Sequence, residues 1–122
     1  MQTVTIKGDL PKLNEIIDLA RTHWAVSAKS KKENTELVRL QCLRMKPITS
    51  PVTMSFEWHV SSNHDPDNIS SGGRKVILDG MVESGKLPND NQKWIVGFEG
   101  DYFYKCAKGQ EKCIVTICEY EE

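Results

Sequence analysis

Several features that define familiar protein classes are scarce in this chain. No apolar run approaches the roughly 20 residues that a membrane-spanning helix needs, and no signal peptide, internal repeat or low-complexity tract is evident. The sequence holds 4 cysteines, with no Cys-x-x-Cys spacing and no paired histidines, which argues against a zinc site and favours free buried thiols. We therefore expect a cytoplasmic protein without a membrane segment.

An excess of positive charge is also missing. The formal net charge is −1, which gives no overall attraction to nucleic acid. The distribution is uneven, because residues 1–49 hold 9 Lys and Arg against 5 Asp and Glu, and residues 50–122 hold 7 against 12. A basic half beside an acidic half suits a nuclease, although an ordinary solvated surface predicts similar numbers. The basic residues best placed to contact a phosphate backbone are Arg21, Lys29, Lys31 and Lys32.

The hydrophobic pattern predicts one domain, residues 1–122, of the α/β (α+β) class, in which a mixed β-sheet packs against helices. The clearest signal is the unbroken alternation of apolar and polar residues from Val52 to Val60, which predicts a strand. Further strands are predicted at 3–7, 93–104 and 112–119, with a bend or bulge at Gly97 and Gly100. Helices are predicted from 14 to about 20 or 24, at 30–45 and at 75–82.

Two acids directly follow the predicted strand 52–60. If the chain is extended there, Asp65 and Asp67 lie on one face and their carboxylates converge, and Pro66 favours that conformation. Close carboxylates favour a hard divalent cation, Mg²⁺, Mn²⁺ or Ca²⁺, with Asp90 as the third ligand. The same Asp-Pro-Asp-Asn tetrad is also typical of a plain turn. A calcium EF-hand is excluded, because its sixth and twelfth positions would be Ser70 and Val76.

The predicted helix at 75–82 carries charged residues near the acids. Ser70 and Ser71 can cap it, and Gly85 and Pro88 follow its end. Lys75 is placed to neutralise charge on a phosphate beside a metal site. Asp79, four residues later, either forms a surface ion pair with Lys75 or holds the metal ligands in position without binding the metal itself.

These motifs together resemble the RusA family of Holliday-junction resolvases, which are widespread in phages and prophages. The resemblance covers most of the chain: Ile6-Lys-Gly-Asp-Leu-Pro11-Lys-Leu-Asn14-Glu, Ala28-Lys-Ser-Lys-Lys-Glu33, Asp65-Pro66-Asp67-Asn68, Lys75-Val-Ile-Leu-Asp79-Gly-Met, and Gly85 followed by Asn89-Asp90. It implies a RusA-like fold and a homodimer. It also implies that Asp65, Asp67 and Asp90 bind Mg²⁺, with Mn²⁺ as the alternative, and that Lys75 is needed for cleavage.

One departure from the family pattern concerns the lysine. In the best-known member the lysine follows the second aspartate after four residues, whereas Lys75 follows Asp67 after eight, with Ser70–Gly73 in between. If these four residues were helical, Lys75 would move by about 6 Å with a rotation of only about 40°. The adjacent glycines favour a loop instead. Arg74 is then the alternative cation at the site and a candidate DNA contact.

The sequence therefore predicts a metal-dependent endodeoxyribonuclease that resolves four-way DNA junctions by phosphodiester hydrolysis in recombination and repair, in a bacterial host or a phage-infected cell. The alternative is a structure-selective DNA-binding protein of the same fold that does not cleave. A third hypothesis, a protein-interaction module, predicts no junction binding at low salt.

Overall fold

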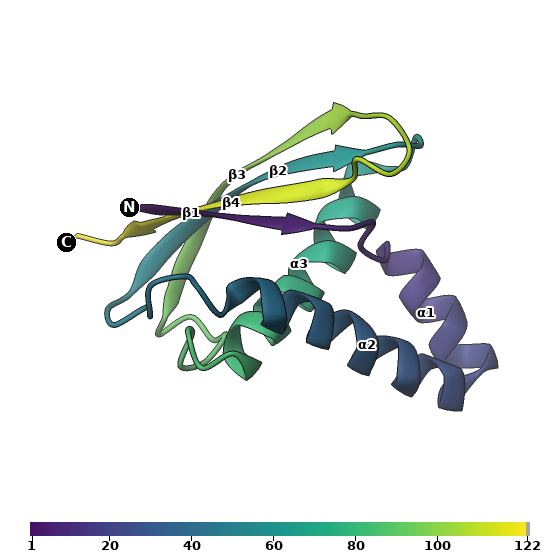
Figure 1. Cartoon of the computed structure of the whole chain (residues 1–122), viewed down its shortest axis with the longest axis horizontal. Coiled ribbons are helices and arrows are strands. Elements are labelled where there is room, and N and C mark those ends of the chain that lie inside the picture. The colour runs from purple at the N-terminus through teal and green to yellow at the C-terminus, as the bar shows by residue number, and fades with distance from the viewer. Residues whose placement is uncertain (122) are drawn as a thin grey trace.

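The computed structural model describes residues 1–121, in which the elements follow the predicted order. They are β1 (Gln2–Lys7), α1 (Leu13–Thr22), α2 (Trp24–Cys42), β2 (Val52–Val60), α3 (Pro66–Glu83), β3 (Ile95–Lys105) and β4 (Lys112–Glu119). The strands form one sheet, and all the labelled helices lie on one face of it (Figure 1). The predicted fold class, a mixed sheet packed with helices, is confirmed.

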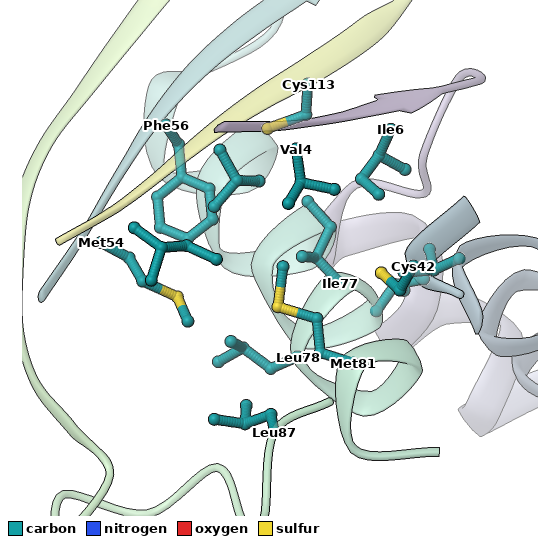
Figure 2. Packing of buried hydrophobic residues seen from close by; sticks show 14 of the residues in the cluster. Val4, Ile6, Cys42, Met54, Phe56, Ile77, Leu78, Met81, Leu87 and Cys113 are labelled. Carbon is teal, nitrogen blue, oxygen red and sulfur yellow. The ribbon is translucent and has the colours of Figure 1, made fainter. Parts of the chain in front are cut away.

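The sheet has the strand order β1-β4-β2-β3. β2 and β3 are parallel and are joined by α3, whereas β4 runs antiparallel to both β1 and β2. The alternation in β2 has the predicted result, since Val52, Met54, Phe56 and Trp58 are buried toward the helices. Figure 2 shows Phe56 and Met54 of the sheet packed near Ile77 and Met81 of α3, so α3 is the helix that completes the core.

β3 carries the irregularities that its glycines predict. Its register against β2 shifts twice, so that Val96 and Glu99 are extra residues beside Gly97 and Gly100. From Asp101 to Lys105 the pairing is regular. The predicted bulges are therefore confirmed and lie in the first half of the strand.

The helix predicted at 75–82 begins nine residues earlier, at Pro66. Proline fits the first helical position, where its missing N–H costs no hydrogen bond. The predictions of a loop at Ser70–Gly73 and of a serine cap are therefore wrong. Ser70 lies inside the helix and donates its hydroxyl hydrogen bond back to the Pro66 carbonyl, at 3.1 Å.

Close packing explains why a helix runs through two adjacent glycines. A Cβ on Gly72 would lie 2.5 Å from backbone atoms of Pro11 and Leu13, and one on Gly73 would lie 2.4 Å from the Trp58 ring. Local propensity disfavours glycine in a helix by about 1 kcal/mol each. Tertiary contact that only glycine permits overrides this preference.

The other helix boundaries differ less from their predicted positions. α2 begins at Trp24, six residues before the predicted start at 30, so Lys29 is helical as well as Lys31 and Lys32. Gly85 follows α3 with φ of +78°, as expected of a glycine that terminates a helix. Within residues 1–121, none of the helices combines the length and the apolar character needed to cross a membrane.

The cysteines were predicted to be free buried thiols. All four are free, but only Cys42 and Cys113 are buried in the core, whereas Cys106 and Cys118 are partly exposed. Burial raises the pKa of the Cys42 thiol to about 11 and also raises that of Cys113. Both buried thiols are therefore protonated and unreactive near neutral pH.

Candidate functional site

The solvent side of α3 carries a row of polar residues spaced four apart, which we call the polar row: Asp67, Ser71, Lys75, Asp79 and Glu83. Each member lies about 6 Å beyond the previous one and is rotated by only about 40°. Neighbouring members therefore lie on the same side of the helix, although the row turns by about 160° around α3 between Asp67 and Glu83. Much of the remaining helix surface is buried in the core. Ser71 takes the position, one turn after Asp67, at which the resembled family has its lysine.

Asp65 and Asp67 lie at the start of α3. Asp65 is extended, as predicted, with φ −64° and ψ 134°, but Asp67 already belongs to the first turn, so the two do not share a strand face. Both are exposed, and the Asp65 side chain does not cap the helix. Within residues 1–121 no hydrogen bond or ion pair occupies either carboxylate. Both carboxylates are therefore free to bind a cation.

Lys75 lies on the wall of a cavity of about 160 Å³ between α1, α2 and α3. Asp79 of the polar row, Glu15 of α1 and Lys31 of α2 line the same cavity, which is otherwise largely apolar. Its remaining lining residues are Pro11, Ile16, Leu19, Ser27, Ser30, Asn34 and Val76. The cavity thus brings the predicted lysine together with Asp79 and with Lys31, one of the basic residues predicted to contact a phosphate backbone.

Asp90 is placed elsewhere. It lines a second hollow together with Asp79, Glu83 and Lys31, toward the end of α3. Asp79 is twelve residues after Asp67, which corresponds to about 18 Å along a helix. Within residues 1–121, no three His, Cys, Asp or Glu side chains group closely enough to hold a metal ion. The structure thus places Asp65 and Asp67 at the start of α3, and Asp90 beside the same hollow as Asp79 further along it.

Arg74 points away from the polar row and into the protein. Its guanidinium forms an ion pair with Asp101 of β3 and lies over the rings of Phe98 and Phe56, 4.1 and 5.0 Å from their centroids. Asp101 also accepts a hydrogen bond from Trp58 Nε1, at 2.8 Å. These contacts fasten α3 to β2 and β3. A DNA contact by Arg74, as the sequence predicted, would require its contacts with Asp101 and Phe98 to break.

We expect Arg74→Ala to lower the free energy of unfolding by about 3 kcal/mol, because it removes the stacking and leaves Asp101 without its cation. Lys29→Ala is the control, since Lys29 is exposed and its ion pair with Glu33 is 3.9 Å long, and it should change stability by less than about 0.5 kcal/mol. Urea unfolding measures both. Equal stability of the two variants would show that the network contributes nothing.

The four basic residues predicted to contact a phosphate backbone, which we call the basic cluster, lie on helices α1 and α2. Arg21 is exposed in the last turn of α1, and Lys29, Lys31 and Lys32 are exposed on α2. Lys31 borders both the cavity beside Lys75 and the hollow beside Asp90, and with Lys32 it lines a third hollow next to Glu83. The exposed surface between α2 and the polar row is therefore where basic side chains and the predicted catalytic residues come closest.

No protein-family model matches the sequence, and no curated protein is significantly similar to it. The RusA resemblance therefore stays a prediction that rests on the quoted motifs.

Sequence reasoning missed the cavity and the role of Asp101. The i, i+4 spacing from Asp67 to Glu83 was present in the sequence and would have revealed the polar row had the helix been extended to Pro66. No sequence signal indicated that Glu15 lines the same cavity as Lys75.

Proposed function

We propose that the chain is a metal-dependent endodeoxyribonuclease that resolves four-way DNA junctions. The observation that carries the proposal is the pair of exposed carboxylates, Asp65 and Asp67, without a protein partner among residues 1–121 at the start of α3, on the helix that also presents Lys75. The motif resemblance supports the same activity. The compartment we propose is the cytoplasm of a bacterial host or a phage-infected cell.

The donor set fits Mg²⁺. This ion typically keeps several waters and is held by one or two carboxylates together with substrate phosphates, so Asp65 and Asp67 alone meet its usual protein requirement. When bound, the metal would polarise the scissile phosphate and lower the pKa of a water. Asp90 would join this set only if another arrangement brings it nearer, because its hollow lies further along α3.

The chain's own residues supply the remaining chemistry. Lys75 is exposed on the polar row and can place its ammonium beside a phosphate that lies along α3, where it would offset developing negative charge. Lys31 and Lys32 would hold the flanking backbone by charge, so junction affinity should fall steeply as salt rises. A homodimer would provide two such sites related by a two-fold axis, which paired cuts require.

Substitutions at the polar row test the lysine assignment. We expect Lys75→Ala to slow junction cleavage about a hundredfold, because one charge stabilising the transition state is lost. Adding Ser71→Lys should restore part of the rate, since residue 71 lies one turn nearer Asp67 on the same side of α3. The control is Lys108→Ala, in the exposed turn between β3 and β4, which should cut normally. Wild-type cleavage by Lys75→Ala would remove Lys75 from the mechanism.

A non-cleaving junction binder of the same fold is the second candidate. It is favoured by the spacing along α3, because the helix rises about 12 Å between Asp67 and Lys75, two turns where the family pattern has one. Both candidates predict junction binding that weakens with salt. Only the nuclease predicts cut products.

A further inference from the structure

The labelled helices cover one face of the sheet, and side chains of a different kind lie on the opposite face (Figure 1). Tyr104, His59, Lys112 and Lys7 are paired in a row that crosses β3, β2, β4 and β1. Trp58, the residue before His59, is buried toward the helices, so this row points the other way. We call this surface the open face, which consists of that row and the next one: Tyr102, Glu57, Ile114 and Thr5.

Two tyrosines of the open face are held against the sheet. The Tyr102 ring lies over Gly100, since a Cβ on that glycine would be 3.0 Å from the Tyr102 Cε2 atom. The Tyr104 ring stacks on His59, with ring centroids 5.1 Å apart and an angle of 22° between the planes. Tyr102 nevertheless remains 58% exposed and Tyr104 45% exposed. Both rings are therefore fixed in position and still offer much of their surface to a ligand.

The spacing of the rings suits a chain of planar groups. Tyr102 and Tyr104 are two residues apart in the regular half of β3, which corresponds to about 7 Å along the strand. Each ring can therefore receive its own planar group. Successive bases of a single nucleic-acid strand stack on aromatic side chains in this way, whereas the bases of a duplex are already stacked on one another.

The charges on the open face favour an anion. Lys7 is exposed and Lys112 is half-buried, and within residues 1–121 neither forms an ion pair. They lie on neighbouring strands in the same row as Tyr104. Glu57 is the single acid in the two rows. A strand whose base stacks on Tyr104 would thus meet two unpaired cations as its backbone crosses the sheet.

We infer that the open face binds single-stranded DNA. Tyr102 and Tyr104 stack two bases, and Lys7 and Lys112 hold the phosphates beside them. The choice of DNA over RNA rests on the proposed function, whereas the stacking and the charges do not. The open face lies across the sheet from α3, so the inferred contact is separate from the polar row (Figure 1).

Fluorescence anisotropy of a labelled oligothymidylate of about 12 nucleotides tests the inference, at low salt and in EDTA. Tyr102→Ala and Tyr104→Ala should each raise the dissociation constant at least about fivefold, and the double variant at least about thirtyfold, because each removes one stacked base. The corresponding phenylalanine variants keep the rings and should bind like wild type, which separates lost stacking from a lost fold. Tyr120→Ala is the control, since Tyr120 is exposed beyond the end of β4.

The salt dependence of the same binding tests the lysines. Lys7→Gln and Lys112→Gln should each reduce the slope of log affinity against log salt concentration by about 0.7, because one phosphate contact is lost. Glu57→Gln should tighten binding, since it removes the acid from the open face. Lys108→Gln, in the exposed turn between β3 and β4, should leave the slope unchanged.

Three results would overturn the inference. They are no binding of the oligothymidylate at low salt, binding that the double tyrosine variant leaves unchanged, and equal or tighter binding of an oligouridylate of the same length. EDTA keeps this measurement independent of cleavage. Junction cleavage without oligothymidylate binding would therefore contradict the open-face inference alone, and oligothymidylate binding without junction cleavage would contradict the proposed nuclease alone.

Discussion

Replacing Gly72 by alanine should lower the free energy of unfolding by about 3 kcal/mol or more, although glycine to alanine normally stabilises a helix by about 1 kcal/mol. The new Cβ would lie 2.5 Å from Leu13 N and from the Pro11 carbonyl oxygen. Both are backbone atoms, which cannot rotate away, so α3 and the segment before α1 must separate. This is the largest stability effect that we expect from a single methyl group in this chain.

Two other glycines of the chain provide comparisons for Gly72→Ala. Gly80→Ala should also destabilise, since its Cβ would lie 2.4 Å from Val38, but this contact is with a side chain that can shift. Gly97→Ala is the control, because no atom lies within 4 Å of the position that its methyl group would take in β3. Urea unfolding by circular dichroism should rank Gly72→Ala as least stable and Gly97→Ala near wild type. Equal stability of Gly72→Ala and wild type would contradict the close packing of α3.

Asp67→Asn should reduce junction cleavage by about a thousandfold while leaving junction affinity equal or higher. The substitution removes a metal-binding carboxylate, and metal activation contributes several kcal/mol to such reactions. It also removes a negative charge from the surface that must approach phosphates, which explains the retained or improved binding. The opposite directions of the two effects separate a catalytic loss from misfolding, which would lower both.

Asp18→Asn on α1 is the matched control for this substitution, because it removes an equally exposed carboxylate outside the polar row. Cleavage and gel-shift affinity would be measured for both variants on the same labelled junction. Cleavage at the wild-type rate by Asp67→Asn would mean that Asp67 binds no catalytic metal. Equal loss in both variants would point to a general charge effect.

The sequence predicted the structure correctly where a local pattern determines it. The alternation in β2 was predicted with correct ends at Val52 and Val60, because one buried face dictates both side-chain direction and strand length. Gly85 was also assigned correctly, since a positive φ after a helix favours glycine on local grounds. In both cases the controlling interaction lies within a few residues.

The start of α3 was not predicted correctly, because contacts between residues far apart in the sequence determine it. Two adjacent glycines favour a loop by propensity, and only the packing of Gly72 on Pro11 and of Gly73 on Trp58 reverses that preference. The wrong start of α3 also made the predicted positions of the site residues wrong. A continuous helix places Asp67 and Lys75 about 12 Å apart and carries the chain to Asp90 near Asp79, so the spacing of the acids depends on a helix that propensity did not predict.

The central claim is tested most directly by incubating the wild-type chain with a labelled synthetic four-way junction and, in parallel, with a linear duplex built from the same arms. Each substrate is treated with Mg²⁺ and with EDTA. We predict paired symmetric nicks in the junction that require Mg²⁺ and are absent from the duplex. Tight junction binding without nicks in either Mg²⁺ or Mn²⁺ would contradict the nuclease and leave the non-cleaving binder as the function of this fold.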